Sequence, residues 1–405
     1  MNLLQKVSLQ IKPDNKVIKE ADEFVKKINK EIRLKKIKAT AVAGGSIAKG
    51  TFLKNDHDVD IFVKFDYSCR NKDISKLLGN ILKKLKPELV HGSRDYYQIK
   101  NKLTYEIIPV LDIKKPEMAV NVTDMSPLHV SWVRKFPQYL KDIRLAKQFC
   151  KSIKVYGAES YIKGFSGHVL DILVINYKGF LNLLKNSQKW KRYTVIDFYN
   201  AHKGNALRNL NRSKISPLIV IDPIQPKRNA AAALSEEKIN VFKEAAGKFL
   251  EKPSETFFIK KEFTIDEIKR KYKNYKIIFL ELIPKEEKTD VSGAKLLKAF
   301  EHIKKHIKIN DFNLVHSDWK WDKEAIFYFV LKKEVLPMYV ERVGPPLHEK
   351  EYVKNFKKKH KKTFIRKDRV YAKVKRRYRK VEELIKDLIK DGYIKEKVRK
   401  IKMLK

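Results

Sequence analysis

Cysteine is almost absent from the 405-residue chain, which contains only Cys69 and Cys150. Two thiols exclude a framework of several disulfide bonds and any zinc site built from four cysteines. No apolar run approaches the roughly 18 residues that a membrane-spanning helix needs, and the first residues lack the apolar centre of a signal peptide. These absences predict a soluble, cytoplasmic protein with no membrane contact.

Acidic residues are scarce beside basic ones. The chain has 48 Asp and Glu against 91 Lys and Arg, which gives a formal net charge of +43 at pH 7. An enzyme of small metabolites rarely needs that excess, whereas a polyanionic partner explains it. Adaptation to a hot or unusual cytoplasm is an alternative, and the two explanations are compatible. Since apolar residues make up 43% and can bury a sizeable core, we expect a folded protein that handles nucleic acid.

Helical and strand patterns alternate in the first 125 residues, which we expect to form one mixed α and β domain. The predicted elements are, in chain order, a helix over 13–37, a strand over 57–65, a helix over 72–86 and a hairpin of strands 95–100 and 102–113.

Three further regions follow. Residues 126–255 are mostly helical in pattern, and residues 256–345 combine buried-type strands with a helix. Residues 346–405 form a basic tail, in which 351–380 holds 15 Lys or Arg against 2 acids. The predicted fold class is α+β and multidomain, with a mixed-sheet catalytic domain, a helical central domain, and an α+β C-terminal body with the basic tail.

The sharpest local signal is a pair of acids, Asp58 and Asp60, 12 residues after Ser46. Residues two apart on a strand point to the same face, so the two carboxylates project together. Carboxylates that close repel each other unless a cation lies between them, and hard oxygen ligands suit Mg²⁺. We therefore predict a magnesium site here.

A two-metal phosphoryl-transfer site usually has a third carboxylate. Glu106, on the second strand of the predicted hairpin, is the candidate, and Asp112 is its competitor. Six residues along a strand span roughly 20 Å, so both cannot serve one site. We prefer Glu106.

The segment before the two acids has the features of a phosphate loop. Gly44 and Gly45 let the backbone approach phosphate oxygens, and Ser46 adds a hydroxyl and an N–H at the start of a short predicted helix, 47–51. Lys49 adds positive charge. A glycine-serine pair is often only a turn and two spaced acids are often a solvated strand end, but their combination predicts an active site.

These motifs resemble those of a known family. GGSIAKGT (44–51), DVD (58–60) and the downstream acid resemble the polymerase-beta-type nucleotidyltransferase superfamily. From about residue 15 to 380 the chain resembles the archaeal (class I) CCA-adding enzymes, tRNA nucleotidyltransferases that build the 3′-terminal CCA. The segments that carry this resemblance are SPLHVSW (126–132), RLAKQFCK (144–151), VYGAESYIKGFSG (155–167), DPIQPKRNAAAALS (222–235) and RVGPPLH (342–348).

The resemblance implies a role for each matching residue. Asp58, Asp60 and Glu106 would be the catalytic, metal-binding acids. The nucleotide would be bound by Gly45, Ser46, Lys49, His129, Lys147, Tyr156 and Arg228, with Arg228 reading the base edge together with tRNA phosphates. Glu106 stands where the family commonly has Asp, and Lys49 stands where Arg is common, which loses a bidentate phosphate contact.

Four of these residues also have plain structural explanations. His129 could be a satisfied helix-start histidine and Lys147 a solvated helix lysine. Tyr156 could serve packing with its hydroxyl capped, and Arg228 could be a surface phosphate contact.

The expected reaction is the template-independent addition of C, C and A to tRNA from CTP and ATP, with Mg²⁺. The basic tail, in which aromatic residues interleave with Lys and Arg, would contact RNA, or else be a solvated lysine-rich face. The rival functions are another nucleotidyltransferase, such as a poly(A) polymerase or a small-molecule enzyme, and a non-catalytic RNA-binding relative. The sequence leaves the oligomeric state open, a homodimer included.

Overall fold

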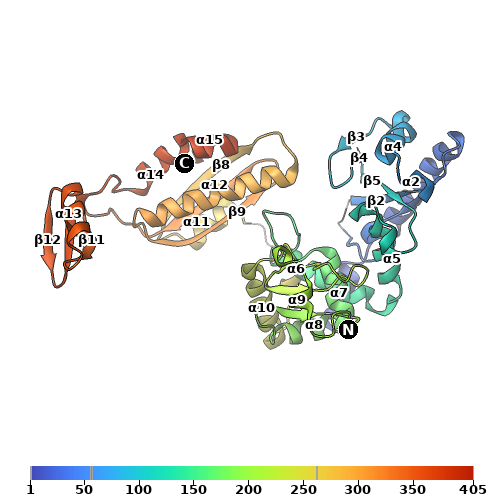
Figure 1. Ribbon diagram of the computed structural model, residues 1–405, viewed down its shortest axis with the longest axis horizontal. Coiled ribbons are helices and arrows are strands. Elements are labelled where there is room, and N and C mark those ends of the chain that lie inside the picture. The colour runs from blue at the N-terminus through green and yellow to red at the C-terminus, as the bar shows by residue number, and fades with distance from the viewer. Residues whose placement is uncertain (1, 55, 57, 261–262, 405) are drawn as a thin grey trace. The chain divides into compact units, whose positions relative to one another are not determined.

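The computed structural model describes residues 2–54, 56, 58–260 and 263–404, and the chain divides into two compact units, Met1–Lys261 and Glu262–Lys405 (Figure 1). No helix within these described ranges is both long enough and apolar enough to cross a membrane.

A mixed five-stranded sheet forms the start of the first unit. Its strand order is β1-β2-β5-β4-β3, in which β2 and β5 are parallel and the other neighbours are antiparallel. The strands are β1 (Ala39–Ala43), β2 (Asp58–Phe65), β3 (Glu88–Val90), β4 (Tyr96–Lys100) and β5 (Thr104–Leu111).

Helices cover both faces of this sheet. On one face, α2 (Asn15–Leu34) and α4 (Ile74–Leu82) pack on Val59, Ile61 and Val63 of β2, all fully buried, as the alternation predicts. On the other face, α3 (Gly45–Lys49) and α5 (Ser126–Arg134) pack around Phe62. The two acids of β2 belong to this second face.

The predicted elements of this region are confirmed, with shorter bounds. The helix expected over 13–37 begins after Asp14, whose side chain accepts a hydrogen bond from the N–H of Lys16 at 2.8 Å and caps α2. The helix expected over 72–86 ends as α4 and continues as a 3₁₀ turn, Lys83–Leu85. Residue 57, the expected start of β2, lies outside the described residues.

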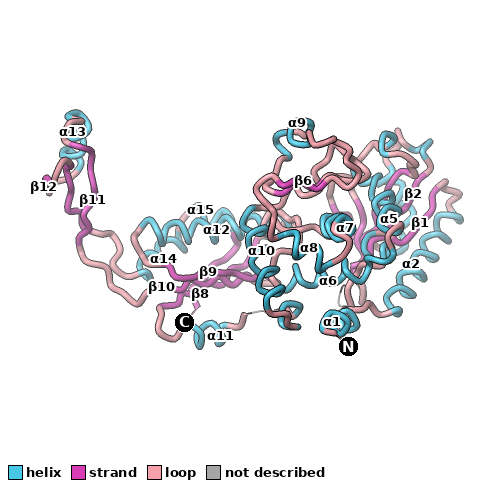
Figure 2. Tube along the Cα trace, turned by 90° about the horizontal axis from the view of Figure 1, so that it is seen from below, coloured by secondary structure: helices cyan, strands magenta, loops and turns pink. Residues whose placement is uncertain are grey.

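The rest of the first unit is mainly helical, as expected, with one short parallel pair of strands (Figure 2). Its core is rich in phenylalanine and surrounds α7, whose residues 169–175 are all buried. The elements are α1 (Leu3–Gln10), α6 (Leu140–Ser152), α7 (Gly167–Asn176), α8 (Phe180–Ser187), β6 (Thr194–Ile196), α9 (Ala206–Asn209), β7 (Leu218–Val220) and α10 (Glu236–Glu251).

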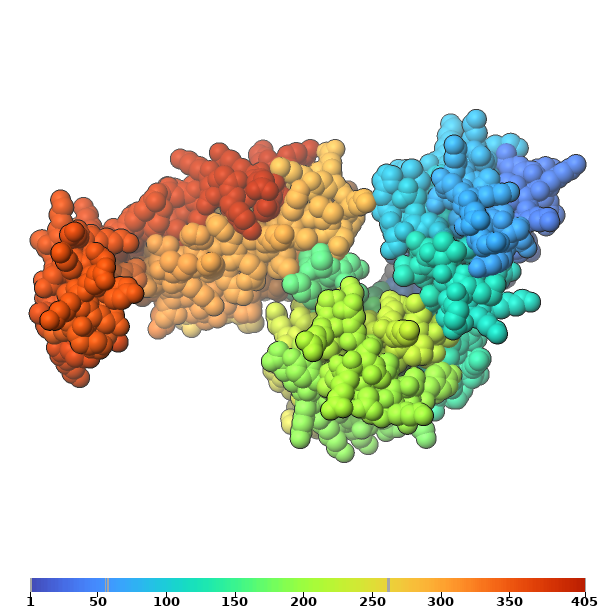
Figure 3. Space-filling view, viewed as in Figure 1, coloured from blue at the N-terminus to red at the C-terminus, as the bar shows by residue number. Residues whose placement is uncertain are grey.

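The second unit holds two sheets. The first, in the order β14-β8-β10-β9, packs against α12, α14 and α15, and the second, in the order β11-β13-β12, packs against α13. Figure 3 shows the side chains of the second sheet and α13, in orange-red, as a compact group. The elements are α11 (Ile265–Lys271), β8 (Lys276–Pro284), α12 (Thr289–Ile309), β9 (Leu314–Trp321), β10 (Ala325–Leu331), β11 (Tyr339–Pro346), α13 (Lys350–Lys359), β12 (Thr363–Arg366), β13 (Arg369–Lys375), α14 (Val381–Lys390), α15 (Gly392–Lys397) and β14 (Val398–Leu404).

Contacts between elements cross two of the domain boundaries that the sequence suggests. The boundary between 345 and 346 falls inside β11, and β14 pairs with β8, so the expected body 256–345 and tail 346–405 share one core. The cause is an apolar stripe of α14, Val381, Leu384, Ile385 and Leu388, which the basic composition of the region obscures. Residues 1–125 and 126–255 likewise lie together in the first unit, which extends to residue 261.

Candidate active site

Three carboxylates lie on one face of two neighbouring strands. Asp58 and Asp60 belong to β2, which pairs in parallel with β5 so that Asp60 lies directly opposite Glu106. Gln98 of β4 donates its side-chain amide to Glu106 Oε1 at 3.2 Å. The competitor Asp112 lies beyond the end of β5, where it pairs with Lys64 at 2.7 Å. The structure therefore groups the three acids that the sequence selects as metal ligands.

The surroundings of Asp60 and Glu106 disfavour the charged forms of these two acids in the absence of a cation. Burial raises the pKa of Asp60; Lys49 opposes the shift and Asp58 adds to it. Burial also raises the pKa of Glu106, and the charges of Asp60 and Asp58 raise it further. A donor set made only of carboxylate oxygens, crowded enough to repel, fits a hard divalent cation such as Mg²⁺.

The first residue of α3 lies against one of these carboxylates. Gly45 has φ +49°, and a Cβ on it would lie 1.6 Å from Asp60 Oδ2. The N–H of Gly44 donates to the backbone oxygen of Asp60 at 2.7 Å. The loop is therefore as close to the acids as the sequence predicts. The helix starts at Gly45 rather than residue 47, which places Ser46 in its first turn.

Two lysines converge on a buried acid beside this loop. Lys49 Nζ lies 2.8 Å from Oδ2 of Asp171, a fully buried residue of α7. Lys147 of α6 donates to the Oγ1 of Thr51 at 2.9 Å and lies 4.0 Å from Asp171 Oδ1.

Two lysines share one carboxylate in this group. Burial would raise the pKa of Asp171, but the charges of Lys49 and Lys147 outweigh burial and lower it. Burial lowers the pKa of Lys147 to about 8. Both lysines also act electrostatically on Asp60, so positive charge is concentrated next to the three acids. Lys147 is buried and hydrogen-bonded, which rules out a solvated helix lysine.

The glycine-rich segment at 155–167 brings Tyr156 to the same lysine. A Cβ on Gly167 would lie 3.0 Å from the Tyr156 hydroxyl and 3.5 Å from Cε of Lys147. Lys151 Nζ lies 5.2 Å from the centre of the Tyr156 ring. Burial raises the pKa of Tyr156, so its hydroxyl stays protonated and can donate.

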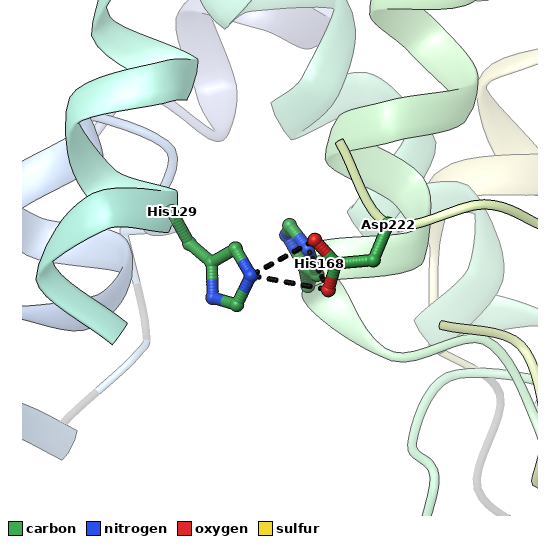
Figure 4. Close-up of side chains that lie close together, drawn as sticks. All are labelled: His129, His168 and Asp222. Carbon is green, nitrogen blue, oxygen red and sulfur yellow. Dashed lines mark hydrogen bonds and ion pairs between the residues drawn. The ribbon is translucent and has the colours of Figure 1, made fainter. Parts of the chain in front are cut away.

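A second polar cluster joins three parts of the first unit (Figure 4). His129 of α5 places Nε2 3.1 Å from both oxygens of Asp222, which follows β7. His168 of α7 places Nε2 3.4 Å from Oδ2 of the same carboxylate. Arg228 Nη1 lies 3.1 Å from Asp222 Oδ2, and the Arg228 side chain is 49% exposed. His129 is therefore a positioned, buried residue.

This cluster has the residue types of a metal site, with its ligand atoms within 4.8 Å of one another. The carboxylate, however, already accepts hydrogen bonds from the N–H groups of Ile224 at 2.9 Å and Gln225 at 3.2 Å, besides the ion pair with Arg228. An ion would have to compete with a guanidinium for the same oxygen. The cluster therefore fits a hydrogen-bond centre better than a metal site.

Three polar residues of this region are absent from the sequence-based prediction: Asp171, His168 and Asp222. Asp171 interrupts the apolar run VLDILVIN of α7, and a charge in a buried helix requires partners, so this signal was present in the sequence. Asp222 follows the apolar run LIVI directly. His168 carries no comparable signal.

Comparison with known proteins identifies the same regions. Three family models match the chain: a nucleotidyltransferase domain over residues 25–118, the second domain of tRNA nucleotidyltransferase over 141–259, and the C-terminal domain of the CCA-adding enzyme over 286–400.

Solved structures also resemble part of this chain. A cytoplasmic RNA terminal U-transferase matches with a TM-score of 0.51 and 14% identity, over 64% of this chain and 98% of that chain. The Cid1 RNA terminal uridylyl transferase matches with a TM-score of 0.51 and 12% identity, over 65% and 98%. At this identity the likeness establishes the nucleotidyltransferase fold alone, which confirms the predicted fold class.

Curated relatives extend the similarity along the chain. The CCA-adding enzyme of Methanocaldococcus jannaschii is 30% identical over 96% of this chain and 90% of its own length. The CCA-adding enzyme of Nanoarchaeum equitans is 35% identical over 81% and 82%, and that of Sulfolobus acidocaldarius is 31% identical over 95% and 90%. The chain therefore belongs to the archaeal CCA-adding enzyme family of tRNA nucleotidyltransferases.

Proposed function

We propose that this protein adds C, C and A in turn to the 3′ end of tRNA, taking them from CTP and ATP without a nucleic-acid template and releasing pyrophosphate. The observation that carries the proposal is that Glu106 lies directly opposite Asp60, two residues along β2 from Asp58, while Gly45 of the glycine loop lies against Asp60. We also expect the protein to lie in the cytoplasm. The reaction itself requires no homodimer, and the sequence leaves the oligomeric state open.

The reaction centre is the carboxylate group. Two Mg²⁺ ions held by Asp58, Asp60 and Glu106 would lower the pKa of the tRNA 3′-hydroxyl and neutralise charge on the α-phosphate and leaving pyrophosphate. Asp58 and Asp60 would hold both ions, and Glu106 would hold the one next to the 3′-hydroxyl. The 3′-hydroxyl would lose its proton to solvent, and its oxygen would form a bond to the α-phosphorus as the bond to pyrophosphate breaks.

The triphosphate would lie along the start of α3. Gly45 and Ser46 provide backbone N–H groups and a hydroxyl, and Lys49 and Lys147 provide positive charge held in place by Asp171. The Tyr156 hydroxyl, near Lys147, would donate to a phosphate or to the sugar. These groups would act by positioning and by electrostatics.

The base and the sugar would lie nearer the second cluster. His129 would contact the sugar or triphosphate, and Arg228, half exposed, would present its N–H groups to the base edge. The basic residues between 346 and 405 would hold tRNA by charge and shape, because tRNAs of different sequence must all be accepted. Arg366, for example, lies over the rings of Phe364 and Tyr371.

The test is incorporation of labelled CTP and ATP into a tRNA transcript that lacks its CCA end, with Mg²⁺. We expect two C additions and one A addition, then a stop, and no product with Asp58→Ala. The matched control is Asp112→Ala, which removes an acid of the same sheet outside the site and should retain activity. Long A tails without use of CTP would indicate a poly(A) polymerase instead. Salt-sensitive tRNA binding without incorporation would indicate a non-catalytic relative.

A further inference from the structure

Asp222 is a buried acid with many partners, outside the group of three acids proposed to bind metal. It is fully buried, and its carboxylate meets side chains from α5 and α7 and from its own loop. Burial would raise its pKa, but the hydrogen bonds that His129 and His168 make to the carboxylate lower it far below the usual value. The carboxylate is therefore ionised and acts only as an acceptor.

The loop that carries Asp222 is closed at its base. The N–H of Asp222 donates to the backbone oxygen of Arg228 at 3.1 Å, and Ile221 forms an antiparallel bridge with Asn229. The side chain of Asn229 accepts from the N–H of Val220 at 3.0 Å. The carboxylate then caps the loop from inside through the N–H groups of residues 224 and 225. These contacts within the loop fix the position of Asp222 independently of Arg228 and the two histidines.

This fixed acceptor holds one end of a half-exposed arginine. In the described part of the chain, the one hydrogen bond of the Arg228 side chain is the 3.1 Å contact of Nη1 with Asp222. A guanidinium has five N–H donors in a planar fork, so the contact leaves most donors for a ligand and restricts the orientation of the plane. Without Asp222, the Arg228 side chain would lose this hydrogen bond and with it the restraint on its plane.

The two histidines meet the carboxylate from other sides. Because an ionised carboxylate only accepts, the Nε2 atom of His129 must carry its proton, which fixes the orientation of that ring. The rings of His129 and His168 pack with centroids 4.2 Å apart. Burial lowers the pKa of His168 to about 4, so it adds no positive charge near pH 7. Asp222 thus aligns Arg228 and His129 together.

The second cluster is connected to the phosphate side of the site through α7. His168 and Asp171 are one turn apart on this helix, and Asp171 binds Lys49 of α3 at 2.8 Å. Lys49 also acts electrostatically on His168. A nucleotide with its phosphates at the start of α3 therefore has the Asp222 cluster beside it.

We propose that Asp222 is a positioning residue for base selection: it orients Arg228 and His129 so that only cytosine and adenine are accepted. The inference rests on the proposed function and adds to it a residue that touches neither the substrate nor a metal. Its loss relaxes the choice of base and leaves the metal-binding acids unchanged.

Asp222→Asn is the primary test, because it keeps the shape and presents an amide donor to Arg228 and His129. We expect KM for CTP and ATP to rise about tenfold and discrimination against UTP and GTP to fall about tenfold, with kcat changed by less than about threefold. Asp222→Glu, which keeps the charge but moves it by one methylene group, should show the same loss and covers a failure of Asp222→Asn to fold. Asp112→Asn is the matched control and should behave as wild type.

A double-mutant cycle separates positioning from a merely structural role. If Asp222 acts through Arg228, adding Asp222→Asn to Arg228→Ala produces little further loss of base discrimination. If Asp222 had only a structural role, Asp222→Asn would lower the melting temperature and kcat but leave the preference among the four nucleotides intact. The effects of the two substitutions would then be additive, and that result would overturn the inference. Wild-type protein that incorporates neither CTP nor ATP would overturn the proposed function and this inference with it.

Discussion

Gly45 shows how a missing side chain can be a requirement of the site. Its φ of +49° is a conformation that L side chains adopt rarely, and a Cβ would overlap the Asp60 carboxylate. We expect Gly45→Ala to lower kcat by at least about a hundredfold, because misplacing a reacting group by about 1 Å already costs that much. The assay is the CCA addition described above.

The control for this change is Gly204→Ala. Gly204 also has a positive φ, +80°, but a Cβ there would meet nothing within 4 Å. It therefore carries the backbone strain, about 1 kcal/mol, without the collision. Equal losses of activity in the two variants would contradict the role assigned to the contact with Asp60.

His168 predicts a pH dependence of stability. Burial lowers its pKa from 6.5 to about 4, so between these values the unfolded chain binds a proton that the folded protein does not. Stability is therefore lost as the pH falls from 6.5 to 4, by up to roughly 3 kcal/mol. Melting temperatures across this window should fall less steeply for His168→Gln than for wild type. His91→Gln, at an exposed histidine, should retain the wild-type slope.

The three acids proposed as metal ligands could be grouped from the sequence, because β periodicity and one strand pairing suffice to make them neighbours. The strand pattern and the parallel pairing of β2 with β5 are enough to place Asp60 beside Glu106. The second cluster could not be predicted from local patterns. His129 lies on α5, His168 on α7 and Asp222 in a loop, and His129 and Asp222 are 93 residues apart. No periodicity in the chain encodes that convergence.

At the scale of elements, α7 is the clearest example of a helix that must carry a charge in a core. Its residues 169–175 are all buried, and Asp171 among them is compensated by Lys49 and Lys147. Removing one partner of a buried ion pair leaves the others uncompensated, so Asp171→Asn should destabilise the protein by about 3–5 kcal/mol. The measurement is the melting temperature of the first unit's transition in the full chain.

The pair between Asp112 and Lys64 provides the comparison for that variant. Asp112 is about half exposed, and solvent screens its pair with Lys64, so Asp112→Asn should change stability by no more than about 1 kcal/mol. A similarly small loss of stability in Asp171→Asn would mean that water reaches Asp171 and that this acid does not hold Lys49 and Lys147 in place.

Elements also explain why composition separates two C-terminal regions that share one core. Local periodicity correctly marked buried-type strands and a helix within residues 256–345, where the structure has β8, α12, β9 and β10. The pairing of β14 with β8 joins residues more than a hundred positions apart, and nothing local in the basic segment VRKIKML specifies it. The basic composition of this segment reflects its exposed side chains, whereas the strand with which it pairs depends on the tertiary fold.

For the whole molecule, the net charge of +43 leads to the last prediction. If the charge serves RNA, tRNA binding releases counterions, and about 6–10 phosphate contacts would weaken affinity about 10³- to 10⁵-fold between 50 and 200 mM salt. If the charge only reflects a hot or unusual cytoplasm, affinity should depend weakly on salt. Binding of tRNA to the full chain across this salt range distinguishes the two explanations.

The same titration can locate the RNA-binding surface. Lys354, Lys357 and Lys358 are exposed on α13, whereas Lys26, Lys27 and Lys30 are exposed on α2, so equal charge can be removed from either unit. We expect the α13 triple change to Ala to reduce the slope of log affinity against log salt by about one per lost phosphate contact, at unchanged kcat with saturating tRNA. The α2 triple change should leave the slope intact. Equal slopes in the two variants would mean that the basic C-terminal residues hold tRNA no more than the rest of the surface does.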